Sequence, residues 1–577
     1  MKIINFLKYN FAIILLALFS VFIAIYPQLV LQYKLGADYK GIARISSDDE
    51  NYYWARGQEI IDGHSSLGNP YIFEYKNRPT IQFFMPDFII AKSLSWTGLS
   101  IVKIFFVYDI VLTFLLTVLT YLCLFRLTKS RFWSTSGSTF LIMGMFFYFF
   151  NRPISPQFNF IFFLTQFIFL LGYVQGSERS KTYFYLSLLN FGFLFYLYTY
   201  YWTFYFILLF ILSVFLFIRG NKSLSYGVFS ILSGGVLIGS YYIYKSLTTA
   251  KIPEYWETLT RLGMIKSHMP SGMAMVLIGG ILSLGYLYFF YKTKKTDAVN
   301  ILLFSGILAG MIAVNQHLIT GLNLAFTVHY FLPVLFWYIF SMFFVFSQIE
   351  NLSLKKSLIL IFASYFVIFY ISWTNYQITM HLPKYLIDFY EIKDSEIYSQ
   401  NYAPIFDWLN NNTQKDDVVL SNEVISNNIP VYTHNNILYS RMSNLHFMSD
   451  DEVTRRFYIN NYFEEKDREF IIKNFPALYG TRYTDIYGHD SQVNKLRSIF
   501  GLNLVPLNFY PDVAINKVLS VFESMKKYTY FDLLKQYRVD YFVWDKNKNP
   551  DWNLDKYKFL KKEYSINNIE IYKYIKI

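Results

Sequence analysis

The sequence predicts a polytopic α-helical membrane protein with a small α/β domain at its carboxyl end, and three observations support this. Apolar residues make up 54% of the 577 residues and aromatic residues 21%, whereas charged residues make up only 16%. The apolar residues gather in blocks of about 18 to 25 residues, the length that a helix needs to cross the hydrocarbon core of a bilayer. Residues 375–577 are more polar, with short β-branched runs between Asn-rich turns, so the chain changes character near residue 375.

About eleven apolar blocks carry the expected membrane spans of a transmembrane domain over residues 1–374. The run from 182 to 218 is too long for one crossing, so we expect it to turn back near Tyr200. The first block follows Lys2 and Lys8 as a signal peptide would, but its apolar stretch is too long, and we expect a retained helix. The expected spans lie near 11–31, 100–125, 132–150, 158–175, 183–199, 201–218, 225–244, 272–291, 299–317, 325–346 and 357–374.

Lysine and arginine residues gather in every second short loop between these spans, at 125–131, 177–181, 219–223, 291–296 and 352–357. Such a bias is typical of the cytoplasmic side of a cell membrane. The net charge of +12 is then explained by topology and by contact with anionic membrane lipids, and no nucleic-acid partner is expected. The amino terminus is expected in the cytoplasm, and the loop 34–99 and residues 375–577 outside it.

The outer region 375–577 alternates strand-like and helix-like patterns. Strands are expected at 417–422, 429–440, 539–545 and 569–577, and helices at 450–463 and 530–537. The single cysteine, Cys123, lies in an expected span, so packing rather than disulfides should hold this domain together. An animal secretory protein would more often have disulfides in such a domain, so the single cysteine favours a prokaryotic cell membrane.

Three consecutive acids, Asp48, Asp49 and Glu50, stand in the first outer loop. A carboxylate there can accept a proton from an attacking hydroxyl as a general base, or can help to hold a divalent cation. The same acids would also suit the first turn of a helix that Ser47 or Asp48 caps, without any chemistry. Both interpretations stay open at this point, and we assign no metal or other cofactor.

Further polar side chains stand at the outer ends of the expected spans. Arg152, in the turn FNRPISPQFNF at 150–160, could hold a phosphate with its planar fork of donors or could reach to the lipid headgroups. Gln316 and His329 stand at the outer ends of two consecutive spans, where they could face a cavity or bond to neighbouring helices.

These features together resemble a known superfamily. An acidic pair in the first outer loop, an Arg-Pro turn between the third and fourth spans, the hairpin YLYTYYW at 196–202 and a soluble carboxyl-terminal region resemble the GT-C membrane glycosyltransferases. Protein O-mannosyltransferases and bacterial aminoarabinose transferases are members. The segment Asp49-Glu50-x-x-Tyr53 is similar to the Asp-Glu-x-x-Tyr of the aminoarabinose-transferase-like branch. By this resemblance Asp49 is the catalytic acid, or Asp48 if the register lies one residue earlier.

The resemblance implies a transferase that moves a sugar from a polyprenyl-phosphate carrier to a glycan, lipid or protein outside the cytoplasm, with inversion. Arg152 would face the phosphate, and Arg78, in NRPT, is a second candidate that could equally form a salt bridge. The Trp-Trp-Asp-Tyr-Gly signature of the oligosaccharyltransferase branch is absent, which argues against transfer of a whole glycan to asparagine. The candidate substrate-binding residues are Glu50, Tyr53, Arg78, Arg152, Gln157, Tyr198, Gln316 and His329.

A transporter or flippase of lipid-linked glycans is the main alternative. Asp109, the only acid deep in an expected span, would be its coupling residue, unless it simply pairs with Lys103 or a nearby tyrosine. Such proteins usually show internal pseudo-symmetry and broken helices, and neither is clear in this sequence. A ligase or polymerase of lipid-linked glycans is a nearer alternative, because it would use the same kind of donor.

Overall fold

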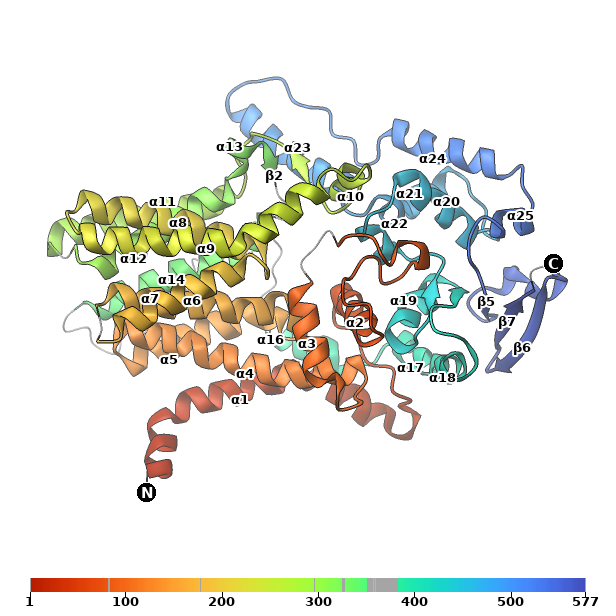
Figure 1. Cartoon of the computed structure of the whole chain (residues 1–577), viewed down its shortest axis with the longest axis horizontal. Coiled ribbons are helices and arrows are strands. Elements are labelled where there is room, and N and C mark those ends of the chain that lie inside the picture. The colour runs from red at the N-terminus through yellow and green to blue at the C-terminus, as the bar shows by residue number, and fades with distance from the viewer. Residues whose placement is uncertain are drawn as a thin grey trace.

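The computed structural model describes residues 2–80, 84–176, 178–294, 296–323, 327–349 and 382–575, with residues 356 and 359. Long helices, lying roughly along the longest axis, fill one end of the molecule, and a mixed α/β region fills the other (Figure 1). The amino terminus and the carboxyl-terminal sheet therefore lie at opposite ends.

Six helical segments of the described residues are long and apolar enough to cross a membrane. They comprise α1 (Lys2–Leu35), α4 (Ile101–Thr128), α6 (Asn159–Val174) with the π-helical turn before it, α8 (Thr199–Ile218), α9 (Lys222–Thr249) and α11 (Met273–Thr293). Two shorter apolar helices, α12 (Ala298–Val314) and α14 (Phe331–Ser347), pack beside them. The protein is thus mostly helical and compatible with a place in a membrane.

Each of the first ten expected spans overlaps a helix, and of the eleventh, 357–374, only residue 359 is described. The expected turn near Tyr200 is confirmed, because α7 (Ser180–Leu194) ends and α8 begins at Thr199. The expected count of eleven crossings is not confirmed. The α-helical part of α5 (Arg131–Leu141) is short, and the chain continues through a π-helical turn and a 3-10 turn to Phe149.

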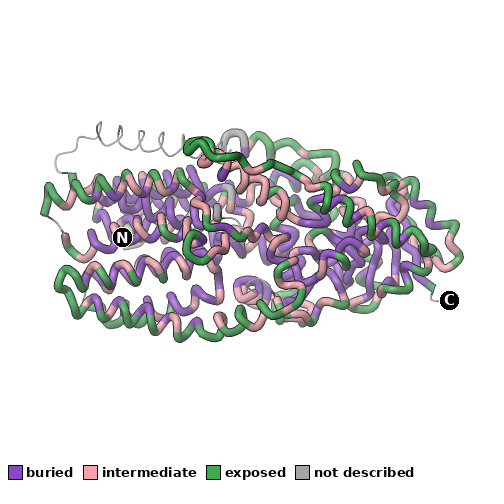
Figure 2. Tube along the Cα trace, turned by 90° about the horizontal axis from the view of Figure 1, so that it is seen from above, coloured by how far each residue is buried: buried purple, intermediate pink, exposed green. Residues whose placement is uncertain are grey.

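Large apolar side chains cover the outward faces of the long helices. On α11, Leu277, Leu284 and Tyr291 are 63%, 68% and 74% exposed. Figure 2 shows exposed positions recurring along the helices with buried positions between them. A soluble protein rarely exposes such extended apolar faces, which suit contact with lipid chains.

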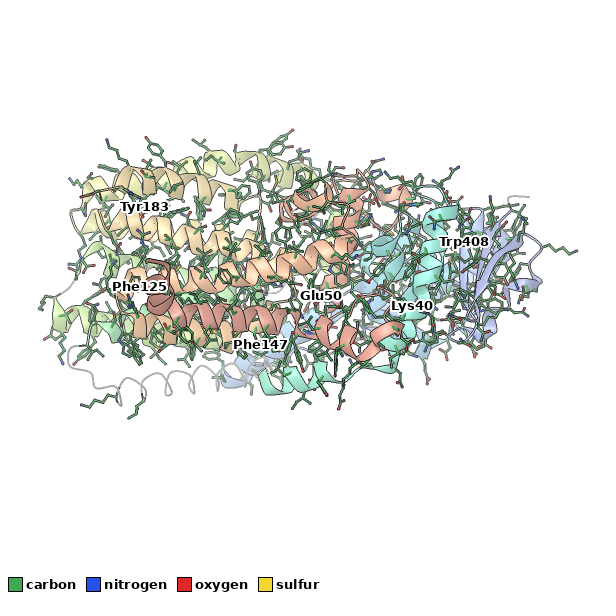
Figure 3. All side chains as sticks on the ribbon, turned by 90° about the horizontal axis from the view of Figure 1, so that it is seen from below. Lys40, Glu50, Phe125, Phe147, Tyr183 and Trp408 are labelled. Carbon is green, nitrogen blue, oxygen red and sulfur yellow. The ribbon has the colours of Figure 1, made fainter. Side chains whose placement is uncertain are left out.

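The residues labelled in Figure 3 are spread along the length of the molecule. Phe125 and Tyr183, which lie close to two of the basic loops, are at one end, and Lys40 and Trp408 are toward the other. Glu50 lies between them, where the helices meet the α/β region. Glu50 is therefore separated from these basic loops along the length of the helices.

The α/β region is built on a five-stranded mixed sheet with the strand order β4-β3-β5-β7-β6. The strands are β3 (Val418–Leu420), β4 (Asn436–Ile437), β5 (Tyr541–Asp545), β6 (Leu560–Ile566) and β7 (Ile569–Tyr574). β3 runs parallel to β4 and β5, whereas β5, β7 and β6 pair antiparallel. Strands expected at 417–422, 539–545 and 569–577 are confirmed, and β6 was not predicted.

The strand expected at 429–440 is wrong over its first half. Residues Glu423–Tyr432 form the helix α19, and only Asn436–Ile437 form a strand. The Asn422 side chain accepts a hydrogen bond from the N–H of Ile425 at 3.0 Å and so caps the helix, a signal that outweighs the β-branched run that follows. The expected helices are present as α20 (Asp450–Asn460) and α25 (Tyr530–Leu534).

The loop 34–99 is built into the α/β region. Arg44 donates to the carbonyl oxygens of Phe389 and Glu391 at 2.6 Å each and pairs with Glu396 at 2.7 Å. The N–H of Ile437 in β4 donates to the carbonyl oxygen of Tyr71 at 2.8 Å. The two segments share one hydrophobic core, and the expected boundary at 374/375 lies outside the described residues.

Further helices and one hairpin surround the loop 34–99 and the five-stranded sheet or lie at the ends of the long helices. They are α2 (Asp48–Ile61), α3 (Met85–Ser95), α10 (Tyr255–Arg261), α13 (His317–Thr320), α16 (Leu382–Tyr390), α17 (Asp394–Ser399), α18 (Ala403–Asn412), α21 (Arg468–Lys473), α22 (Phe475–Tyr479), α23 (Arg482–Ile499) and α24 (Asp512–Met525), with β1 (Ile265–Lys266) paired to β2 (Leu322–Asn323).

Candidate functional site

The three acids form the first turn of α2, where the positive end of the helix dipole favours negative charge. Ser47 occupies the cap position with an extended backbone, but its side chain accepts no capping hydrogen bond. The helix-start interpretation therefore explains where the acids stand but not what the Ser47 hydroxyl does. The side chain of Asp48 lies outside the described residues.

Asp49 forms an ion pair with Arg152, which comes from the turn between α5 and α6. Arg152 Nη2 lies 2.7 Å from Asp49 Oδ2, and the two side chains are 17% and 51% exposed. Burial lowers the pKa of the Arg152 guanidinium, but Asp49 raises it, and the pKa ends above its ordinary value. The structure thus joins the acid of the first outer loop to the Arg-Pro turn, two features that lie far apart in the sequence.

Tyr53, Tyr198 and His329 gather around the same guanidinium. Tyr53 hydrogen-bonds Arg152, and burial raises its pKa to about 12 although Arg152 opposes the rise. Tyr198 Oη hydrogen-bonds His329 Nδ1. The charge of Arg152 acts on the His329 ring. Arg152 therefore lies amid three aromatic side chains that carry hydrogen-bonding groups.

Glu50, also in the first turn of α2, is buried, with 3% of its surface exposed. Its Oε2 accepts a hydrogen bond from the N–H of Ser46 at 3.2 Å. Burial raises the pKa of Glu50 to about 8, despite hydrogen bonds from the Ser46 region and the charge of Arg152. Asn151 contacts the same segment, because its Nδ2 donates to Ser46 Oγ at 2.9 Å and also to Tyr385 Oη at 3.1 Å.

Gln157 lies deeper, between the turn and α4. Its Nε2 is 3.3 Å from Asp109 Oδ1 and 3.1 Å from the carbonyl oxygen of Phe149, and its Oε1 is 3.3 Å from Thr113 Oγ1. Within the described residues, Asp109 therefore pairs with Gln157 rather than with Lys103 or a tyrosine. Gln157 positions the turn that carries Arg152.

The Asp49–Arg152 pair joins two segments, and these segments contain five buried polar atoms that have no hydrogen-bond partner in the described part of the chain. They are Ser47 Oγ, Glu50 Oε1, Asn51 Oδ1, Asn151 Oδ1 and Arg152 Nε. A buried unpaired polar group costs about 1–3 kcal/mol, and functional sites are where such groups persist. The site can therefore offer both donors and acceptors to a polar ligand.

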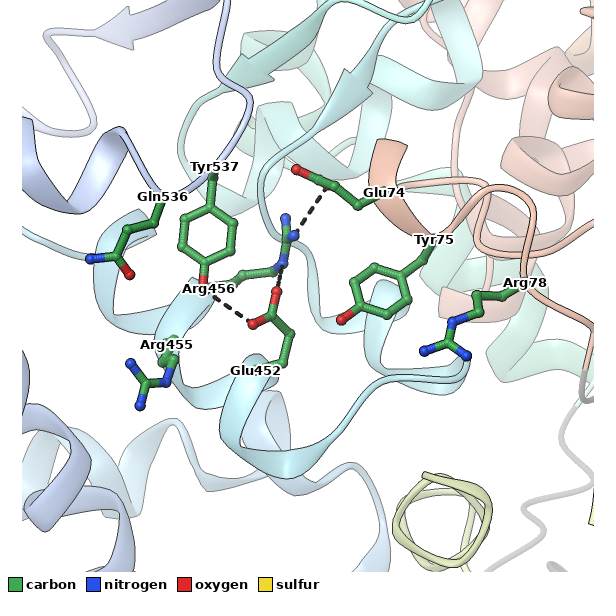
Figure 4. Close-up of a pocket in the computed structure, with 8 residues that line it drawn as sticks. All are labelled: Glu74, Tyr75, Arg78, Glu452, Arg455, Arg456, Gln536 and Tyr537. Atoms are coloured by element: carbon green, nitrogen blue, oxygen red, sulfur yellow. Dashed lines mark hydrogen bonds and ion pairs between the residues drawn. The ribbon is translucent and has the colours of Figure 1, made fainter. Parts of the chain in front are cut away.

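Arg78 and Gln316 do not join this group. Arg78 Nη2 pairs with Glu254 at 3.1 Å, and Gln316 Nε2 donates to the carbonyl oxygen of Leu322 at 2.8 Å. Arg78 lines a separate cavity of about 530 Å³ between the first outer loop and the α/β region (Figure 4). The other lining residues are Glu74, Tyr75, Glu452, Arg455, Arg456, Gln536 and Tyr537. Both predicted residues are thus engaged in contacts away from Asp49.

Sequence reasoning missed Ser46, Asn151 and Tyr385. Asn151 could have been found, because it precedes Arg152 in a polar turn between two apolar blocks. Tyr385 lies on α16, far along the chain, and only the fold brings its hydroxyl to Asn151.

Searches with the sequence find no matching family model and no matching curated protein. Among the described residues, no group of three or more His, Cys, Asp or Glu side chains is arranged to hold a metal ion. The site is therefore interpreted from its own geometry.

Proposed function

We propose that the protein is a membrane glycosyltransferase of the GT-C type, which moves a sugar from a polyprenyl-phosphate carrier to an acceptor outside the cytoplasm. The observation that carries this proposal is the Asp49–Arg152 pair, with 2.7 Å between a half-exposed carboxylate and a guanidinium. Glu50, next to this pair, lies where the helices meet the α/β region (Figure 3). A lipid-linked donor presents its phosphate at such a level while its prenyl chain stays among apolar helices.

The reaction divides between these two side chains. Asp49 takes the proton of the acceptor hydroxyl while the acceptor oxygen bonds to the anomeric carbon. The bond from that carbon to the carrier phosphate breaks, and the phosphate leaves with the bonding electrons. Arg152 stabilises the leaving charge with its fork of donors. Because the acceptor enters opposite the phosphate, the anomeric configuration inverts.

The unpaired Nε of Arg152 suggests how the donor would prepare the base. Without a donor, Nη2 is held by Asp49. A phosphate that takes Nε and competes for Nη2 would release the carboxylate to accept a proton. His329 and Tyr198 would add further hydrogen-bonding groups on the same side.

Transfer of radiolabelled sugar from a panel of polyprenyl-phosphate donors in membranes tests the proposal. Wild type should label an acceptor, Asp49→Asn should not, and Asp38→Asn, which changes an exposed acid of the same loop, should behave as wild type. Absence of transfer across the panel, together with absence of polyprenyl-phosphate binding, would contradict it. The mass of the transferred unit separates a single-sugar transferase from a ligase or polymerase.

A flippase of lipid-linked glycans is the second candidate, because Asp109 lies within α4 against Gln157. Translocation of a fluorescent lipid-linked glycan in proteoliposomes distinguishes the two. A flippase should lose translocation in Asp109→Asn and keep it in Asp49→Asn, and a transferase should show no translocation in wild type.

We also propose that the loop 34–99 and the α/β region lie outside a prokaryotic cell membrane. A cysteine at residue 49 should react with an impermeant reagent in intact cells, and one at residue 294 only after permeabilisation. The opposite pattern would overturn both the topology and the mechanism.

A further inference from the structure

An uncharged apolar segment connects α23 to α24. Between Arg497 and Asp512 the chain has no charged residue. Ile499, Phe500 and Leu504 are 75%, 74% and 61% exposed, and Leu502, Leu507 and Phe509 are also exposed. An exposed apolar stretch of this extent calls for a partner that covers it.

The segment is folded back on α23 by hydrogen bonds. Asn494 Nδ2 donates to the carbonyl oxygen of Val505 at 2.8 Å, and the N–H of Val505 donates to Asn494 Oδ1 at 2.8 Å. The N–H of Leu502 donates to the carbonyl oxygen of Arg497 at 2.9 Å, and the Arg497 side chain bonds the carbonyl oxygen of Asn503. Several backbone groups are thus paired within the segment, so its apolar side chains project from an ordered base.

Contacts place α23 at the outer ends of the apolar helices. His489 Nε2 lies 2.7 Å from Ser267 Oγ, six residues before α11 begins. Ser267 follows β1, which pairs with β2 in the connection between α12 and α14. Figure 1 shows α23 beside α13 and β2 at this level. Leu318 and Ile319 on α13 are exposed as well, so apolar side chains are also open at this end of the bundle.

We propose that residues 499–509 insert into the outer leaflet of the membrane as an interfacial anchor of the α/β region. Lipid is the partner that this position selects, because the segment continues the apolar surface of helices that suit a bilayer. Lys495 and Arg497, on the last turns of α23, would then meet the lipid headgroups. The anchor would hold the height of the α/β region above the bilayer. This inference depends on the membrane location of α11 and α12 and not on transferase activity.

Spin labels on the full chain in nanodiscs of phosphatidylcholine and phosphatidylglycerol test the anchor. Labels are attached to Phe500→Cys, Leu502→Cys and Tyr528→Cys in a Cys123→Ala background. Leu502 and Tyr528 are both 53% exposed, but Tyr528 lies between α24 and α25, near the sheet (Figure 1). If Phe500→Cys fails to accumulate, the comparison of Leu502→Cys with Tyr528→Cys is sufficient for the test.

The readout is the accessibility of each label to oxygen, which concentrates in lipid, relative to a water-soluble nickel chelate. We expect a ratio several-fold higher at 500 and 502 than at 528. Equal ratios at 502 and 528 would overturn the proposal. A second result would also overturn it: labels at 500 and 502 that both reagents fail to reach, with the labels of one molecule close to those of another. A second copy of the chain would then cover the segment.

Discussion

Helix α2 carries two acid–arginine pairs that differ in how fully they are bonded. In the first, Arg56 Nε and Nη2 each lie 2.8 Å from an oxygen of Asp87, Nη1 donates to Tyr52 Oη at 3.1 Å, and both charged side chains are 1% exposed. In the second, two turns earlier, Asp49 touches Arg152 through one 2.7 Å contact and is half-exposed.

The difference separates a structural pair from the pair that we propose takes part in the chemistry. The Arg56–Asp87 pair is bidentate and enclosed, so a ligand could reach it only by breaking the fold. The Asp49–Arg152 pair leaves Nε of Arg152 unpartnered among the described residues and keeps the carboxylate open to solvent. Four variants would break or sharpen this comparison.

Asp49→Asn should have the largest effect on activity. Loss of a general base lowers the rate by about 10²–10⁴-fold. Asp49 is 51% exposed, so water can take its place beside Arg152, and the loss of stability should be smaller than for a fully buried pair. Sugar transfer and the thermal midpoint, measured on the same preparation, check both parts. A variant that keeps full transfer would return the acids to a helix-start role.

Asp87→Asn should have the largest effect on stability, since it leaves the buried Arg56 charge without its partner at a cost of about 3–5 kcal/mol. We expect a lower thermal midpoint in detergent and less accumulated protein. The double variant Arg56→Met with Asp87→Leu is the control, because it removes both charges and should recover much of the loss. If Asp87→Asn instead folds normally and loses only activity, the division between the two pairs is wrong.

Arg152→Lys should have an intermediate effect, confined to the donor. Lysine keeps the charge but not the planar fork, and each hydrogen bond to a charged group is worth about 1.5–3 kcal/mol. We expect the KM for a polyprenyl-phosphate donor to rise about ten- to hundredfold, with an unchanged thermal midpoint. Unaltered donor KM, or a protein that fails to accumulate, would favour a structural role for the turn.

The sequence predicts the long helices well because bilayer thickness sets the length of an apolar block. The span expected at 100–125 is Ile101–Thr128 in the structure, and that at 272–291 is Met273–Thr293. Short elements of the α/β region depend on tertiary contacts. The exposed edge strand β6, with its Lys561 and Lys562, shows no apolar alternation that could predict it.

The site was predictable to the extent that its residues stand at the ends of apolar helices. Asp49, Arg152 and His329 meet because the ends of packed helices meet. Gln316 satisfies the same rule but bonds within its own loop, and the partner of Arg78, Glu254, comes from a connection far along the chain. No local pattern encodes which loop end turns toward the site, so residue type and position alone cannot separate the two groups.

The smallest expected effect is on stability and concerns Glu50. Within the described residues, one oxygen of this buried carboxyl of α2 has no hydrogen-bond partner, whereas both oxygens of Asp87 have one. Its pKa of about 8 in the folded chain stands above the ordinary value of 4.5, chiefly because of burial. Between these pH values the folded state holds a proton that the unfolded state releases, so stability falls as pH rises through this window and then levels.

Glu50→Gln removes that proton and should flatten the decline. Near pH 5 the variant and wild type should have similar thermal midpoints, since a neutral carboxyl and an amide are alike in shape. At pH 8.5 the variant should be the more stable. Glu59, whose pKa burial also raises to about 8, is present in both proteins and cancels in the difference. If the thermal midpoints of wild type and variant change in parallel across this pH range, the pKa of Glu50 is not raised in the folded chain.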